Sequence, residues 1–211
     1  LENPKFYRQV TIKDNVRDAY FPTLAILNRD QLLDPSFRNS ANYEAQLSAI
    51  MNDTRKETID EAEEKFAKIF GRRYSGLTEE YRTDDADYII VTLGSIAGLV
   101  RETVDKLRKD GKKVGLLRIR YLRPFPNKEI AEALKNAKGA AVLEKDISFG
   151  NEGTVYTNVN SALKKQNISI PTSNYIGGLG GKNISEAEIE NIFADIENGK
   201  TGVTFLGLGG E

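Results

Sequence analysis

The sequence predicts an α/β protein: a three-layer domain with a mostly parallel sheet at residues 86–198, preceded by a connector helix. Two observations carry this prediction. After Asp85, apolar and β-branched runs alternate with segments of helical period, which is typical of a parallel sheet covered by helices on both faces. Before it, residues 41–70 contain neither Gly nor Pro and repeat apolar side chains every three or four positions, which predicts a long amphipathic helix.

The first 85 residues are expected to form two parts. Pro4, Pro22 and Pro35 leave no room for a long regular element, so residues 1–40 are predicted to be an irregular N-terminal region of a larger chain. Residues 41–85 are predicted to be the connector helix and a linker, with Gly71 at the helix end. Because the chain begins with Leu1 rather than Met, we expect a fragment of a longer polypeptide.

The elements of the main domain are expected to follow one another as strand and helix. Strands are predicted at residues 88–93, 114–119, 140–143 and 173–176, and helices at 96–109, 128–137, 154–165 and from Ser185 onward. Ser185 lies three residues before Glu188, which is the spacing of a capping box. The C-terminal tail, residues 199–211, contains a strand-like stretch that we expect to pair with a sheet edge or a neighbouring molecule.

The composition excludes several classes of function. Lys and Arg total 30 and Asp and Glu total 31, for a formal net charge of -1, so no basic surface favours nucleic acid or an anionic membrane. Cys and His are absent, which excludes disulfides, iron-sulfur ligation, Cys/His zinc sites and nucleophiles activated by histidine. The apolar runs are far shorter than the roughly 20 residues of a membrane helix. We therefore expect a soluble, cytoplasmic protein with no metal site.

Three arginines form the strongest candidate site. Arg118 and Arg120 alternate along the end of the second predicted strand, and Arg123 follows closely. Ligands of open parallel sheets collect at the carboxyl ends of the strands, so these residues are candidates for binding an anion. The favoured alternative is an ion-pair contact with carboxylates across a domain or subunit interface, because buried charges are usually paired within protein.

Ser95 belongs to a second candidate, the segment Gly94-Ser95-Ile96-Ala97-Gly98 between a predicted strand and helix. Such a turn can hold phosphate, but this one lacks the glycine spacing and the lysine of known phosphate loops. We therefore expect Ser95 to cap the helix with its hydroxyl group.

Two further loops contain candidate residues. Glu144 directly follows the third predicted strand and would suit acid-base chemistry if burial raised its pKa, but no second catalytic group accompanies it, so an interface or loop-ordering role is favoured. The glycine run at residues 177–181 precedes Lys182, which could face an anion; a turn that requires glycine is the preferred interpretation.

Residues 70–208 resemble the C-terminal part of the alpha subunit of pyruvate or other 2-oxoacid:ferredoxin oxidoreductases. The matching strings are FGRRYSGLTEEYRTDDADYIIVTLGSIAG, VDKLRKDGKKVGLLRIRYLRPFP, AVLEKDISFGNEG, GGLGGKNI and TFLGL. Lys182 and Asn183 stand where that family is expected to have Arg-Asp. The pattern is also similar to the C-terminal domain shared by transketolase and the E1 component of pyruvate dehydrogenase, so the resemblance implies a transketolase C-terminal-like fold.

The resemblance implies a non-catalytic, structural part of an enzyme complex that converts a 2-oxoacid, with pyruvate favoured, and coenzyme A to acyl-CoA, CO2 and reduced ferredoxin. Thiamine diphosphate, magnesium and iron-sulfur clusters are expected in the complete complex and none in this chain. The implied partners are an N-terminal pyrimidine-binding domain and the other subunits. The alternatives are the C-terminal domain of a transketolase or E1-type enzyme, and a stand-alone module that binds anions or nucleotides.

Overall fold

The computed structural model describes residues 58–74 and 76–207 of the chain. The chain divides into two compact units, residues 1–74 and 75–211, and each is described by itself. In the first unit, residues 58–70 are helical and Gly71 ends the helix with a left-handed φ of 66°, as its sequence position predicts. The irregular region expected at residues 1–40, and residues 41–57 of the expected connector helix, lie outside the described residues.

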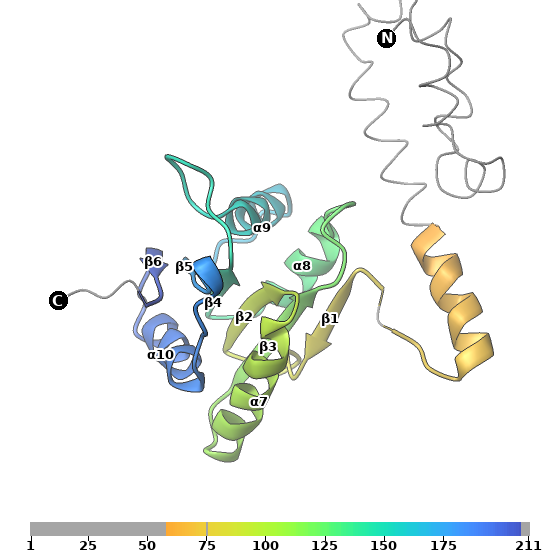
Figure 1. Cartoon of the computed structure of the whole chain (residues 1–211), viewed down its shortest axis with the longest axis horizontal. Coiled ribbons are helices and arrows are strands. Elements are labelled where there is room, and N and C mark those ends of the chain that lie inside the picture. Colours follow the sequence, from red (N-terminus) through yellow and green to blue (C-terminus); the bar gives the residue numbers. More distant parts are fainter. Residues whose placement is uncertain (1–57, 75, 208–211) are drawn as a thin grey trace, which may run out of the picture. The chain divides into compact units, whose positions relative to one another are not determined.

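The second unit contains a six-stranded mixed sheet (Figure 1). Its strands lie in the order β1-β3-β2-β4-β5-β6, with β1 antiparallel to β3 and the other neighbours parallel. Their bounds are Thr78–Tyr81 (β1), Tyr88–Leu93 (β2), Val114–Ile119 (β3), Gly139–Glu144 (β4), Thr172–Ile176 (β5) and Gly202–Phe205 (β6). Among the described residues, the first strand, β1, and the last, β6, therefore form the two edges of the sheet.

Four helices connect the strands. Their bounds are Ile96–Lys109 (α7), Asn127–Leu134 (α8), Thr154–Lys165 (α9) and Glu186–Glu197 (α10), with a short 3-10 turn at Leu179–Gly181 (η1). Within residues 58–74 and 76–207, no helix is long and apolar enough to cross a membrane.

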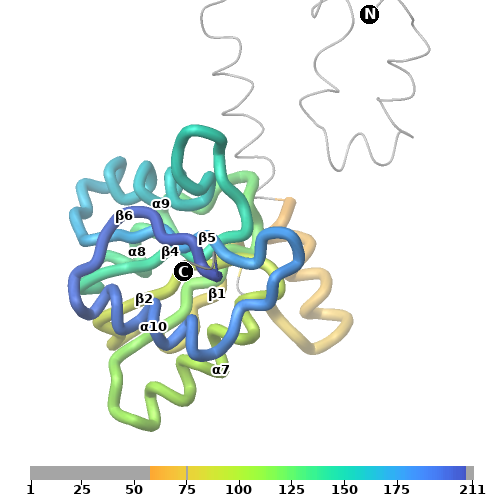
Figure 2. Tube along the Cα trace, turned by 60° about the vertical axis from the view of Figure 1, so that its left-hand side comes forward, coloured from red at the N-terminus to blue at the C-terminus, as the bar shows by residue number. Residues whose placement is uncertain are grey.

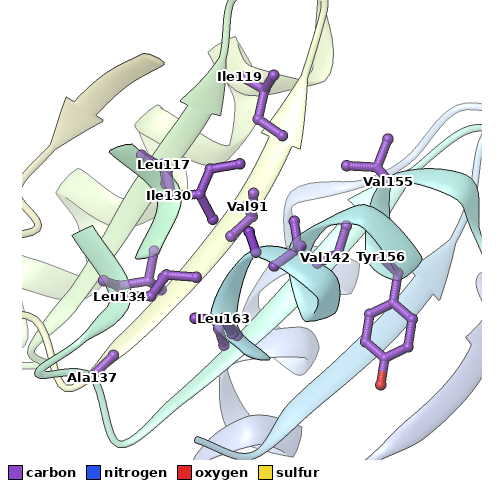
Figure 3. Packing of buried hydrophobic residues seen from close by; sticks show 14 of the residues in the cluster. Val91, Leu117, Ile119, Ile130, Leu134, Ala137, Val142, Val155, Tyr156 and Leu163 are labelled. Atoms are coloured by element: carbon purple, nitrogen blue, oxygen red, sulfur yellow. The ribbon is translucent and has the colours of Figure 1, made fainter. Parts of the chain in front are cut away.

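Two hydrophobic cores lie on opposite faces of the sheet. Successive strand residues point to opposite faces, so Ile89 and Val91 pack with α8 and α9, whereas Ile90 packs with α7 and α10. Figure 3 shows the first core, in which Ile130 of α8 and Val155 of α9 lie over the strands. Helices on both faces explain why strands β2, β3 and β4 consist mostly of apolar residues, and the arrangement is the predicted three-layer α/β fold.

The predicted elements largely coincide with the observed ones. The bounds agree for β2, β3, α7 and α9, and α8 ends at Leu134, three residues earlier than predicted. The strand-like tail is confirmed as β6, which pairs parallel to β5 along residues 202–205. The main difference is β1, which lies inside the stretch expected to be a linker and pairs with β3 through residues Thr78 to Tyr81.

Candidate functional site

The carboxyl ends of four parallel strands bring the candidate residues to one edge of the sheet, here called the carboxyl edge. It includes the residues after β2 (Gly94 and Ser95), the arginines of and after β3, the loop 145–153 after β4, and the glycines after β5. Figure 2 shows loop 145–153 as a teal arch that extends away from the sheet and helices. This is the edge where open α/β sheets bind ligands.

Arg118 pairs with a carboxylate of its own chain. Its Nη1 lies 3.3 Å from Oε2 of Glu79, the residue opposite it on β1, and Arg101 of α7 binds Oε1 of the same carboxylate. The Arg101 guanidinium also lies 4.5 Å from the ring centroid of Tyr81. Two cations therefore share one anion, and the cluster joins the edge strand β1 to β3 and α7.

Arg120 and Arg123 follow β3 in the loop that leads to α8. Arg120 Nη1 donates a hydrogen bond of 2.7 Å to the carbonyl oxygen of Gly76, and the residue is half-buried. Arg123 is exposed; its Nη1 donates to the carbonyl oxygen of Leu122 at 2.7 Å. Of the three predicted arginines, Arg123 is thus the most accessible, whereas Arg118 and Arg120 hold β1 and the residues before it against β3.

The prediction that the Ser95 hydroxyl caps α7 is wrong. Ser95 is the residue before the helix, but its side chain makes no capping hydrogen bond and its backbone is already helical, with φ -72° and ψ -28°. A side-chain cap requires an extended backbone at that residue, which turns the hydroxyl toward the next amides. The backbone carbonyl of Ser95 instead accepts from Gly98 N at 3.2 Å, and the hydroxyl belongs to an exposed residue.

Glu144 is the most completely bonded polar side chain at the carboxyl edge. It is 2% exposed and accepts hydrogen bonds from Val155 N at 2.7 Å, Tyr156 N at 3.1 Å and the Asn174 amide at 2.8 Å. Asn174 Oδ1 in turn accepts from Gly153 N at 2.8 Å. We call this set of bonds, made by Glu144 and Asn174, the Glu144 clamp. It fixes the start of α9 and the end of loop 145–153 to strands β4 and β5.

The ionisation of Glu144 is set by opposing effects. Burial, reinforced by the side chain of Asp146, raises the pKa of the carboxyl group to about 7, although hydrogen bonds from Val155 and Tyr156 favour the charged form. Such a pKa suits acid-base chemistry. Both oxygens are nevertheless occupied by donors of the protein, so the geometry supports the loop-ordering role.

The glycine run at residues 177–181 forms a turn that requires glycine, as its sequence predicts. Gly178, Gly180 and Gly181 have φ of 73°, 63° and 81°, a backbone region that side chains disfavour. The Lys182 ammonium group donates to the carbonyl oxygen of Gly207 in the segment after β6. In this structure Lys182 therefore joins two loops of its own chain.

The residues fit neither a metal ion nor an iron-sulfur cluster. Within residues 58–74 and 76–207, no three acidic side chains gather in a way that could hold a metal, and the whole sequence has no Cys or His. In this described part of the chain, no residue can therefore be assigned to the magnesium of thiamine diphosphate or to a cluster.

Three residues of the site were missed in the sequence: Glu79, Gly153 and Asn174. Asn174 carried a usable signal, because a polar amide inside a buried strand must find hydrogen-bond partners. Glu79 carried little, since nothing in its vicinity indicated a strand.

Together, the fold and these contacts define a three-layer α/β domain with a mostly parallel sheet, in which the polar residues of the carboxyl edge order loops. Residues 86–189 match the model of the family "Pyruvate:ferredoxin oxidoreductase core domain II". The chain therefore belongs to the 2-oxoacid:ferredoxin oxidoreductases, as a portion of an alpha-type subunit.

Individual relatives agree with this assignment. The chain is 42% identical over 175 residues to pyruvate synthase subunit PorA of Methanothermobacter thermautotrophicus, a match that covers 83% of this chain and 44% of the relative. It is 40% identical over 149 residues to ketoisovalerate oxidoreductase subunit VorA of Pyrococcus abyssi, covering 69% and 38%. The chain thus spans less than half the length of either relative.

A solved structure of 2-oxoglutarate:ferredoxin oxidoreductase from Magnetococcus marinus matches with 21% identity and a TM-score of 0.49. That match covers 74% of this chain and 23% of the other.

Proposed function

We propose that this chain is the non-catalytic, interface-forming part of the alpha subunit of a thiamine-dependent 2-oxoacid:ferredoxin oxidoreductase, with pyruvate as the favoured substrate. The complete complex would convert 2-oxoacid and coenzyme A to acyl-CoA, CO2 and reduced ferredoxin. The observation that carries the proposal is the 42% identity to a pyruvate synthase subunit across 83% of the chain. Thiamine diphosphate, magnesium and the clusters would be held by other parts of the complex.

The site supports a structural role over a catalytic one. The charged side chains of the carboxyl edge are mostly used within the chain: Arg118 by Glu79 and Glu144 by the start of α9. Among the predicted arginines, Arg123 is the one left exposed, so we propose it as the arginine that contacts a partner.

Co-purification of this chain with the other polypeptides of the oxidoreductase tests the proposal. The chain should join the complex, and the chain alone should show no 2-oxoacid oxidation with thiamine diphosphate, coenzyme A and an electron acceptor. Turnover by the chain alone, or failure to join the complex, would contradict the proposal.

Arg123→Ala tests the proposed contact. It should weaken association by about 1 kcal/mol, the usual value of an exposed charge contact, and leave the chain folded. Lys165→Ala at the end of α9, also exposed, is the matched control and should have no effect. If phosphate binding to the chain were lost instead, with association unchanged, the anion-binding alternative would be favoured.

A further inference from the structure

Loop 145–153 presents one aromatic side chain entirely to solvent. Phe149 is 102% exposed, so its ring contacts essentially nothing in its own chain. The loop that carries it extends from the carboxyl edge between β4 and α9 (Figures 1 and 2). A single exposed apolar residue on a loose surface loop is ordinary, so the meaning of Phe149 depends on how firmly its loop is held.

The loop is held at both ends and across its middle. The Glu144 clamp fixes Gly153 N and the first amides of α9 with buried hydrogen bonds. Inside the loop, Ser148 N donates to Glu152 O at 3.2 Å, and Asn151 N donates to Ser148 O at 2.9 Å. These bonds close a turn around Phe149, which therefore projects from an ordered support.

Ordering a loop with this clamp costs free energy, because the clamp buries a carboxyl group that water would otherwise solvate. Gly153 completes it: a Cβ atom there would overlap the Glu144 carboxylate and lie 2.9 Å from Asn174 Oδ1. Two buried polar side chains and a required glycine thus serve a loop whose aromatic side chain, Phe149, is fully exposed to solvent. This arrangement is explained if the tip must be presented in one conformation, as for the aromatic anchors of protein interfaces.

The chemistry of the tip indicates the kind of partner. Residues 147–151 (Ile-Ser-Phe-Gly-Asn) carry no charge, whereas Lys145, Asp146 and Glu152 flank them. An uncharged centre with a charged rim is the usual organisation of a protein-protein contact. The chain also spans only 44% of a relative that is itself a subunit, so more protein is available to cover Phe149 than these residues provide.

We propose that loop 145–153 is a docking element that inserts Phe149 into an uncharged, apolar pocket of a protein partner within the oxidoreductase complex, outside these 211 residues. This inference rests on the proposed function and adds a specific contact to it. Glu144 acts as a positioning residue: it does not touch the partner and it holds the loop in the docking conformation.

Photochemical cross-linking in the assembled complex tests the contact directly. Phe149 is replaced by p-benzoylphenylalanine, the complex is irradiated, and the joined peptides are identified by mass spectrometry. The expected result is a cross-link to an apolar peptide of the complex that lies outside these 211 residues. The same photoreactive residue at Lys165, at the far end of α9, is the control and should not form that cross-link.

Association measurements supply a second readout. Phe149→Ala should weaken binding to the partner by about 30-fold or more, equivalent to about 2 kcal/mol, whereas Phe149→Leu, which keeps a large apolar side chain, should weaken it by less than about 10-fold. Neither substitution should change the thermal unfolding of the chain, because the ring has no contacts to lose.

The outcomes separate the two proposals. If the wild-type chain joins no other subunit, the proposed function and the docking element both fail. If the wild-type chain joins the complex but Phe149→Ala binds equally well, the docking element alone is refuted. A cross-link from position 149 only to this chain itself, or to a second copy of it, would also refute the docking element.

Discussion

Replacing Glu144 by Gln tests whether burial outweighs hydrogen bonding in setting the pKa of this carboxyl group. In the folded chain its pKa is raised from an ordinary value of 4.5 to about 7, so the folded state binds more protons than the unfolded state between these pH values. Stability should therefore be highest at or below pH 4.5 as far as this group is concerned, and should fall as the pH rises to 7. The full effect corresponds to about 3 kcal/mol.

The glutamine side chain of the Glu144→Gln variant would have no such titration. It keeps one oxygen for two of the three donors, namely Tyr156 N and the Asn174 amide, and presents an NH2 group toward Val155 N. That change costs about 1 to 3 kcal/mol for a buried donor left without an acceptor, at every pH. The Glu144→Gln chain should therefore show a flatter dependence of stability on pH than wild type.

The measurement is urea unfolding of both proteins at pH 5, 6, 7 and 8. The quantity compared is the difference between their free energies of unfolding, because titrating groups that do not interact with Glu144 cancel in that difference. Relative to Glu144→Gln, wild type should lose up to about 3 kcal/mol between pH 5 and pH 8. If wild type instead gains stability relative to the variant, the three N-H donors outweigh burial and our account of this carboxyl group is incorrect.

The remaining predictions concern glycine and capping residues, each measured by denaturant unfolding. Gly153→Ala should destabilise the chain by about 2 kcal/mol or more, because the new methyl group overlaps the Glu144 carboxylate. Gly98→Ala is the control: this glycine lies in open space on α7, so the substitution should stabilise the chain by about 0.5 to 1 kcal/mol. Equal effects of the two substitutions would contradict the Glu144 clamp. Ser185→Ala should cost about 1 kcal/mol of stability, since the Ser185 hydroxyl accepts a hydrogen bond from Glu188 N. Ser95→Ala should change stability by less than about 0.5 kcal/mol, because Ser95 makes no capping bond. A similar cost at both serines would show that Ser95 does cap α7.

The sequence predicted the elements whose signals are local. Strand β2 is a β-branched run followed by Gly94, and α10 begins with a serine three residues before a glutamate; both are visible within ten residues. Ser95 looked similar to Ser185 but lacks the glutamate, since Gly98 stands at the corresponding position. That difference was available in the sequence and indicates why one serine caps its helix and the other does not.

The features that could not be predicted depend on residues far apart in the chain. Strand β1 has only four residues, two of them glutamates, and it becomes a strand because β3 and the arginines of β3 and α7 receive it. The Glu144 clamp was predictable only in part: the position of Glu144 at a strand end indicated a loop-ordering role. Its partner Asn174 comes from a neighbouring strand thirty residues later in the chain, and sequence spacing does not show that neighbourhood.

The order of the strands has a consequence for how the sheet can be assembled during synthesis. Once β2 and β3 have paired, β4, β5 and β6 emerge in the same order in which they add to the open side, so each new strand meets a free edge. Strand β1 is the exception: it leaves the ribosome before β3, the strand that must lie between it and β2. Residues 78–81 therefore cannot pair with their neighbour in the sheet until Val114–Ile119 has been made, so this edge of the sheet depends on a strand that follows β2 and α7 in the chain.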